Sequence, residues 1–163
     1  MNKGVKFILI ILAIALIGIV SAYFVLGRAN TAPAHLIVES GSVSVDTGNG
    51  YVAALDEMDL SEHDKVKTGN GRATLILYDS VLLSLNPNTE VIIEDLTKQY
   101  PKVKQTEGST WTKFADVVGV KNVDIETPDT VATVRGTEFG VEITETGTVV
   151  VVIEGTVDVT GNG

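Results

Sequence analysis

A run of 20 consecutive residues without a charged side chain, from Phe7 to Leu26, constrains the fold of this chain more than any other feature. At helical rise, a segment of this length crosses the hydrocarbon core of a bilayer. Lys3 and Lys6 precede the run, and this positive flank keeps the N-terminal tip in the cytoplasm. We therefore predict a cytoplasmic tip at 1–6, a single transmembrane helix over the run, and export of everything that follows.

A cleaved signal peptide is the alternative interpretation of this run. The apolar core of a signal peptide is usually about 7 to 15 residues long, which is shorter than the run. The small-residue sites at Val20–Ala22 and Ala32–Ala34 are indifferent as cleavage sites, and we favour an uncleaved anchor because of the length of the run. The chain has no cysteine, so it has neither a lipoprotein site nor a disulfide framework. The exported domain must therefore be held together by its core alone.

The exported part is strongly acidic. After the run it carries 10 basic and 21 acidic residues, a net charge of −11. This charge repels phosphate groups, so we expect neither nucleic acid nor an anionic lipid surface as a partner. Gly27–His35 is rich in small residues and contains proline, which is typical of a short tether, and we predict the folded domain over 36–163.

The predicted domain alternates apolar and polar residues with a period of two, which indicates β-strands. The positions that share a face in three of the stretches are Val43 and Val45; Ala73, Leu75 and Leu77; and Phe139, Val141 and Ile143. Glycine, asparagine and proline turn signals separate the runs at short intervals. The sequence predicts an all-β domain of about ten or more short strands, arranged as a sandwich, a barrel or an irregular β-solenoid.

No catalytic, cofactor-binding or metal-binding site is predicted. His63 is one of two histidines, and since no nucleophile-elbow motif accompanies it, we interpret it as an exposed loop residue. The side chains that could supply oxygen ligands for calcium nearby are Asp56, Glu57, Asp59, Glu62 and Asp64. Their spacing fits no EF-hand loop, and acidic surface loops are common in a chain this negative, so we expect no metal there.

Two further features are interpreted as structural. Lys98, Lys102 and Lys104 form a basic stripe, which we assign to a solvated strand face or to pairing with the acidic stretch at 56–64. Trp111 is interpreted as a packing residue at the core or its rim. The chain has no phosphate-binding glycine loop, zinc pattern or cofactor fingerprint, so nothing in the sequence supports enzyme activity or a cofactor.

The stretch "DIETPDTVATVRGTEFGVEI" resembles the signature of the FecR domain family, in which a Thr-Pro turn and a small-residue strand precede Arg-Gly-Thr-x-Phe. The signature positions in this chain are Thr127, Pro128, Arg135, Gly136, Thr137 and Phe139. Other elements resemble the family in the same order, namely "VESGSVSV", "DKVKTGNGRATLILYDSVLLSLNPNTEV", "GSTWTKF" and "VVVVIEGTVDV". The resemblance therefore covers nearly all of residues 36–163.

Three departures from the family pattern accompany this resemblance. His63 stands where a glycine commonly precedes Asp64, and Ser80 directly follows Asp79 where an Asp-Gly-Ser turn is usual. Family members that regulate iron transport carry a helical anti-sigma region before the membrane helix, whereas only six residues precede Phe7 here. We therefore do not expect this chain to control a sigma factor.

We interpret the signature as a structural corner and not as a substrate site. Pro128 fixes a turn, Gly136 allows a bend or bulge, and Phe139 resumes the inward face of the next strand, while Glu138 is expected to face solvent. Arg135, if it folded inward, would need a carboxylate or several carbonyls, because an unpaired buried charge costs several kcal/mol.

The resemblance and the anchor together predict a noncatalytic, membrane-anchored, extracytoplasmic protein that acts in protein interaction or envelope sensing. One alternative is a structural, self-assembling surface subunit. The other is a carbohydrate-acting hydrolase, which would need paired carboxylates in a cleft. We expect a protein partner or self-association, and the sequence does not identify a small-molecule ligand.

The apolar segment "TVVVVIEGTVDV" has no visible successor in the sequence with which to pair. A flat aliphatic edge of this kind favours aggregation unless something covers it. We therefore expect residues beyond 163, or a strand from a partner, to pair beside Val157 and Val159. The alternative is that Leu36–Val38 closes this edge.

Overall fold

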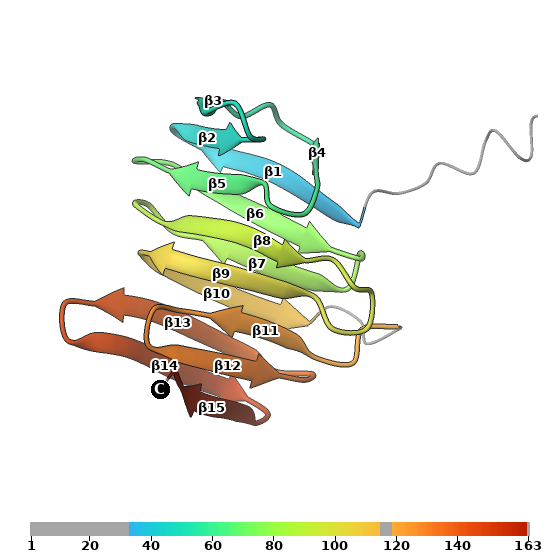
Figure 1. Cartoon of the computed structure of the whole chain (residues 1–163), viewed down its shortest axis with the longest axis vertical. Coiled ribbons are helices and arrows are strands. Elements are labelled where there is room, and N and C mark those ends of the chain that lie inside the picture. Colours follow the sequence, from blue (N-terminus) through green and yellow to red (C-terminus); the bar gives the residue numbers. More distant parts are fainter. Residues whose placement is uncertain (1–32, 115–118, 163) are drawn as a thin grey trace, which may run out of the picture. The chain divides into compact units, whose positions relative to one another are not determined.

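The chain forms a two-layered β-domain in the computed structural model, which describes residues 33–114 and 119–162 (Figure 1). The fifteen strands in these ranges are β1 (Ala34–Ser40), β2 (Val43–Asp46), β3 (Tyr51–Ala53), β4 (Met58–Leu60), β5 (Lys65–Thr68), β6 (Arg72–Leu77), β7 (Val81–Leu85), β8 (Glu90–Asp95), β9 (Lys102–Glu107), β10 (Ser109–Phe114), β11 (Val123–Glu126), β12 (Thr130–Val134), β13 (Glu138–Thr144), β14 (Gly147–Glu154) and β15 (Val157–Gly161). The prediction of an all-β domain with many short strands is confirmed.

The predicted membrane helix at 7–26 lies outside the described residues. Within the ranges that the structure covers, no helix is long and apolar enough to cross a membrane. The first strand, β1, begins at Ala34, two residues before the predicted domain start at Leu36.

The strands divide into a seven-stranded sheet with the order β14-β13-β10-β7-β6-β1-β4 and an eight-stranded sheet with the order β15-β12-β11-β9-β8-β5-β2-β3. All pairings are antiparallel except that of β9 with β11, which is parallel. In both sheets the order follows the chain closely, because the chain crosses repeatedly from one layer to the other as it proceeds (Figure 1). The architecture thus combines the layers of a sandwich with the steady progression of a solenoid.

Both sheets contribute their inner faces to a single hydrophobic core. The alternating residues that the sequence places inward are buried, among them Val45, Leu75 and Phe139, while Ile143 at the end of β13 is only partly buried. Since successive side chains of a strand point to opposite faces, the period of two in the sequence translates directly into this core.

Among the described residues, Gln105 is the largest polar side chain that is fully buried. It follows Val103 on the inner face of β9, where the period of two requires an inward side chain. Its Nε2 donates to the carbonyl oxygen of Gly108 at 2.7 Å, and its Oε1 accepts from the Thr110 hydroxyl at 2.8 Å. A weaker bond of 3.4 Å reaches the carbonyl oxygen of Val141 on β13. Gln105 therefore links the eight-stranded sheet to the seven-stranded one.

The two loops in which the sequence departs from the family pattern adopt backbone conformations that glycine favours. His63 has a φ of 72°, and Tyr78 and Asp79 have φ values of 52° and 53°. These residues accept the left-handed conformation at a modest energetic cost, which Asp and His tolerate better than most side chains.

The two ends of the domain are built differently. At one end the outermost strands are β3 and β4, each only three residues long. At the other end they are β14, which has eight residues, and β15, which has five. Short edge strands offer little backbone for further pairing, so the two ends differ in their capacity to accept another strand.

Candidate functional site

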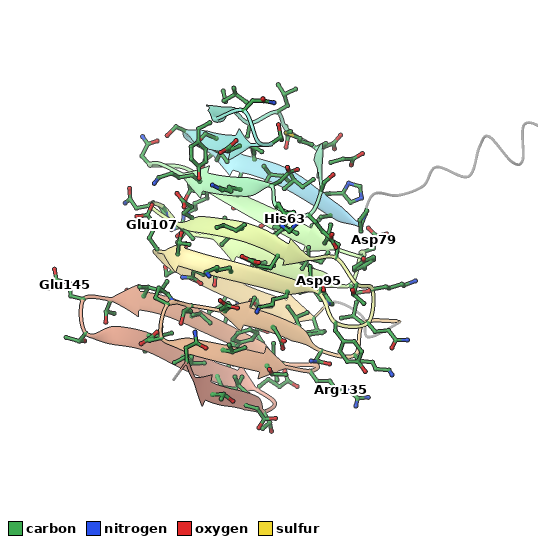
Figure 2. All side chains as sticks on the ribbon, in the orientation of Figure 1. His63, Asp79, Asp95, Glu107, Arg135 and Glu145 are labelled. Carbon is green, nitrogen blue, oxygen red and sulfur yellow. The ribbon has the colours of Figure 1, made fainter. Side chains whose placement is uncertain are left out.

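The Arg-Gly-Thr part of the signature forms the turn at which the chain crosses from β12 in one sheet to β13 in the other. Gly136 has a φ of 59° and open space around its Cα, so backbone conformation alone favours glycine there. Arg135 is exposed at this pole of the domain, whereas Thr137 and Phe139 are buried (Figure 2). Arg135 therefore does not fold inward.

A second crossing, between β14 and β15, stacks on the first. Gly155 has a φ of 92°, and a Cβ at this position would lie 2.4 Å from the Thr137 methyl carbon. The Thr137 side chain thus fills the space that the glycine leaves empty. This contact packs the Arg-Gly-Thr turn against the Glu-Gly turn.

The Thr-Pro-Asp part of the signature lies at the opposite pole and ties the two sheets together. The Asp129 carboxylate accepts from the Thr127 hydroxyl at 3.0 Å and from the backbone N–H of Thr148 at 3.0 Å. Asn162, which follows β15, donates through its side chain to the Thr127 carbonyl oxygen at 3.0 Å. Because Thr148 belongs to β14 and Thr127 follows β11, this clasp joins an edge strand of one sheet to a turn of the other.

Hydrogen bonds from the Thr148 hydroxyl, and then from the Thr127 hydroxyl, lower the pKa of Asp129 below 3.8. A carboxylate that accepts several hydrogen bonds is stabilised in its ionised form. These partners all belong to the domain itself, so the described contacts of Asp129 serve the fold.

Glu138 lies on the outer face of β13, as expected, but neighbouring side chains cover part of it. Its carboxylate is partly buried, accepts from the Trp111 Nε1–H at 3.2 Å and pairs with the Lys113 Nζ at 3.3 Å. β10 and β13 are neighbours, so their outer faces bring these three side chains together. Trp111 covers Gly140, where a Cβ would lie 2.7 Å from the indole ring. Trp111 is therefore a packing residue on the outer rim.

The basic stripe of the sequence does not pair with the acidic stretch at 56–64. Lys102 and Lys104 both contact Glu126, the latter at 3.1 Å, because the parallel pairing of β9 with β11 places them side by side. Hydrogen bonding from Lys102 lowers the pKa of Glu126. Lys98 lies in the exposed loop after β8.

Three acidic side chains of the stretch at 56–64 contact partners in different parts of the fold. Asp56 accepts from the Val38 N–H at 3.0 Å, and Glu62 accepts from the Leu96 N–H at 2.8 Å. Asp59 contacts the His35 Nδ1 at 2.6 Å. His63 is exposed in its loop. Within the described residues, no group of three or more His, Cys, Asp or Glu side chains is arranged to hold a metal ion.

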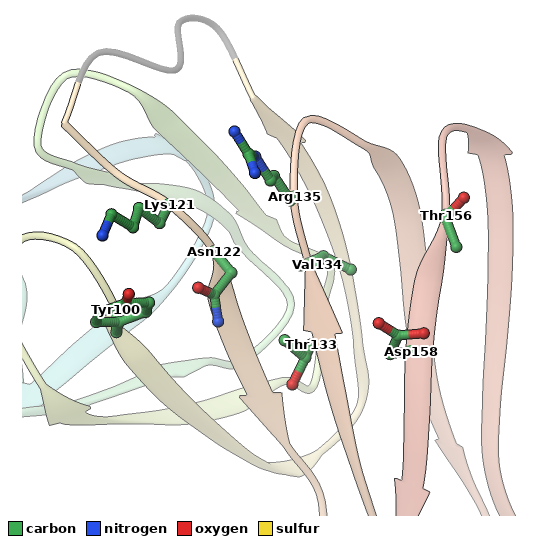
Figure 3. Close-up of a pocket in the computed structure, with 8 residues that line it drawn as sticks. All are labelled: Tyr100, Lys121, Asn122, Thr133, Val134, Arg135, Thr156 and Asp158. Carbon is green, nitrogen blue, oxygen red and sulfur yellow. The ribbon is translucent and has the colours of Figure 1, made fainter.

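A concave region of about 590 Å³ lies beside Arg135 (Figure 3). The residues that line it come from four segments and are Tyr100, Lys121, Asn122, Thr133, Val134, Arg135, Thr156 and Asp158. The Lys121 Nζ lies 5.5 Å from the centroid of the Tyr100 ring, a cation–π distance. Arg135 and Lys121 contribute positive charge to this region and Asp158 contributes negative charge, so its lining combines both signs.

The end formed by β14 and β15 combines exposed aliphatic side chains with two open strand edges. Val152 and Val159 lie opposite the buried Phe139 and Ala132 and so face the core, yet they are 42% and 51% exposed. On the outer face, Val149 and Val151 are 45% and 52% exposed. Within the described residues β14 pairs only with β13, and β15 only with β12. We call β14 and β15 the open end.

A shallow groove on the outer face borders the open end. It has a volume of about 210 Å³, and its apolar part is formed by Trp111, Gly140, Val149 and Val151. Asn86, Ser109 and Glu142 add polar groups to its lining. Trp111 and the apolar run of β14 are separate features of the sequence. Nothing in the linear sequence indicates that β13 brings them into one groove.

The domain matches a known protein family. The family described as FecR protein matches residues 64–158, which extend from the start of β5 into β15. The chain belongs to the FecR family. Neither a curated protein nor a solved structure matches it. Membership in the FecR family indicates a protein related to signalling or sensing.

Proposed function

We propose that this FecR-family chain is a noncatalytic, membrane-anchored signalling or sensing protein whose β-domain lies outside the cytoplasm and binds another protein. The anchor and its orientation rest on the uncharged run from Phe7 to Leu26 and on the lysines that precede it. The noncatalytic role rests on the signature residues, whose described contacts serve turns, crossings and packing. Fold alone does not establish function, so the proposed protein binding rests on the surface of the open end.

The open end is the single observation that supports protein binding most directly. Five of the ten exposed large hydrophobic residues belong to β14 and β15, the two strands at this end. Contiguous exposed apolar side chains beside unpaired strand edges are typical of surfaces that another chain covers. Strand addition at such an edge gives affinity through main-chain hydrogen bonds, and the side chains give specificity.

Cross-linking in cells tests this function. A photoreactive amino acid replaces Val151 on β14 in the full chain, and the matched control carries it at Val52 on β3, which is also an exposed valine on an outermost strand. We expect a discrete cross-linked protein from position 151 and none from position 52. If position 151 yields no cross-link to any other protein, or the same products as position 52, protein binding at the open end is wrong.

Orientation in the membrane is tested separately. The chain contains no cysteine, so a single cysteine in place of the exposed Glu145, in the turn between β13 and β14, is the only thiol present. We expect a membrane-impermeant maleimide to label this cysteine in cells whose cytoplasmic membrane is intact and whose outer layers let the reagent reach that membrane. Labelling only after that membrane is dissolved would contradict the extracytoplasmic location.

A further inference from the structure

The β14 strand has the composition of a strand that is covered on both faces. Its residues from Thr148 to Ile153 include five consecutive aliphatic side chains, whereas a strand with one solvated face alternates apolar and polar residues. Val150 packs against the core on the inner face. The outer-face residues Val149 and Val151 remain about half exposed, so the outer cover that the composition requires is missing from the described residues.

The free edge of β14 also lacks the features that protect natural edges. Edge strands commonly avoid pairing by being short, by carrying lysine or proline, or by bulging away. β14 has eight residues and neither lysine nor proline, and its register shift lies at one end, beside Glu138. Most of its length therefore remains regular and can accept a partner strand.

Charge around the open end indicates the chemistry of that partner. From Gly136 to Asn162 the chain carries five acidic side chains and no basic one. Glu138 is neutralised by Lys113, but Glu142, which lies opposite Val149, and Glu154 at the end of β14 are exposed. A second copy of this chain would bring the same acidic groups against one another, which is destabilising. A basic partner is favoured by the same field.

We propose that the open end binds an extended segment of another protein in which apolar and basic side chains alternate, added as a strand at the free edge of β14. On the inner face its apolar side chains extend the row of Val150 and Val152, the latter 42% exposed. On the outer face its basic side chains lie on the side of Glu142 and Glu154, and their aliphatic stems cover Val149 and Val151. This inference rests on the proposed function and specifies the partner's chemistry. Trp111, the single tryptophan of the chain, lines the adjoining groove and reports on its occupation.

The test uses the purified full chain in detergent micelles, with Trp111 fluorescence as the readout. Three short synthetic peptides are the probes: one alternates valine and lysine, one alternates valine and glutamate, and one alternates serine and lysine. We expect saturable binding of the valine–lysine peptide, which weakens at high salt because the charges are exposed. The other two peptides should bind at least about tenfold more weakly, since each lacks either the charge or the apolar contact.

Variants locate the binding. Val151→Lys should abolish binding of the valine–lysine peptide, whereas Val52→Lys at the far end should leave it unchanged. Glu142→Lys should shift the preference towards the valine–glutamate peptide, and this exposed position keeps the test decisive if Val151→Lys does not fold. Equal binding of both charged peptides, or equal effects of Val151→Lys and Val52→Lys, would overturn the inference.

Two further outcomes are distinguishable. If sedimentation shows that the unliganded full chain is a dimer that Val151→Lys dissociates, a second copy is the occupant and the inference is wrong. If cross-linking from position 151 in cells captures a protein through an acidic or helical segment, the proposed function stands and only the chemistry assigned to the partner fails. Absence of any cross-link would instead remove the proposed function itself.

Discussion

Replacement of the buried Gln105 by alanine should destabilise the domain strongly, because this side chain links the two sheets. Truncation to alanine removes a volume similar to that lost when a buried Leu or Met is truncated, which costs about 2 kcal/mol or more. It also leaves the Thr110 hydroxyl, only 3% exposed, without its 2.8 Å partner. A buried donor left unpaired costs a further ~1–3 kcal/mol. The expected loss is therefore about 3–5 kcal/mol.

Thermal unfolding of the full chain measures this loss against the matched control Gln99→Ala, whose side chain is exposed. The control should change stability by less than about 0.5 kcal/mol. For a domain of this size, Gln105→Ala should lower the Tm by roughly 10 °C or more. Equal Tm values for the two variants would refute the assignment of Gln105 as a bridge between the sheets.

A second comparison separates the hydrogen bond from the cavity. Gln105→Leu keeps most of the volume but leaves the Thr110 hydroxyl unpaired, so it should cost about 1–3 kcal/mol. Adding Thr110→Val removes the orphaned donor, and the double variant should be more stable than Gln105→Leu alone. If the second substitution lowers stability further, the polar contact does not account for the effect of Gln105.

Three other predictions concern the corners, the clasp and metal. Gly136→Ala should cost about 1 kcal/mol of stability because of its backbone conformation. Gly155→Ala should cost more, because only there does the new methyl group meet the Thr137 side chain, at 2.4 Å. Equal melting points of the two variants would contradict the stacking of the two crossings. The pKa of Asp129 is lowered in the fold, so its stabilisation is present above pH 3.8 and is lost as the pH falls through the folded pKa. The stability difference between the wild type and Asp129→Asn should therefore narrow as denaturation is measured from about pH 5 down to about pH 2, and a constant difference would argue against an ionised clasp. Calcium added to the chelated full chain should leave its Tm unchanged, whereas a saturable rise would reveal a site in the stretch at 56–64.

Local patterns in the sequence predicted the strands and the crossings well, because both depend on short-range physics. Alternation placed Leu75 and Phe139 inward, and glycine at position 136 indicated a bend. The same alternation places Gln105 inward with Val103. Because Gln105 is polar, a pattern of alternating apolar residues does not identify it as a buried position. A buried glutamine is identified only when its hydrogen-bond partners on the other sheet are known.

Contacts between distant segments could not be derived from the sequence. The pairing of Lys102 and Lys104 with Glu126 depends on the parallel alignment of β9 and β11, which no local signal specifies. The partial cover over Glu138 could not be predicted because the neighbour that supplies Trp111 lies on another strand. The alternative in which Leu36–Val38 closes the last edge is wrong, since β1 pairs with β4 and β6. Strand order decides each of these cases, and it emerges only from the packing of the whole domain.

Backbone hydrogen exchange in the full chain, at a concentration where it is monomeric, shows whether both edges of the open end are free until a partner covers them. In an antiparallel edge strand, alternate N–H groups point away from the only neighbour and lack a partner. We predict that every second amide of β14 and β15 exchanges rapidly, except that of Thr148, which donates to Asp129, while the amides of β13 and β12, paired on both sides, are protected. Uniform protection along β14 and β15 in the monomer would contradict the account.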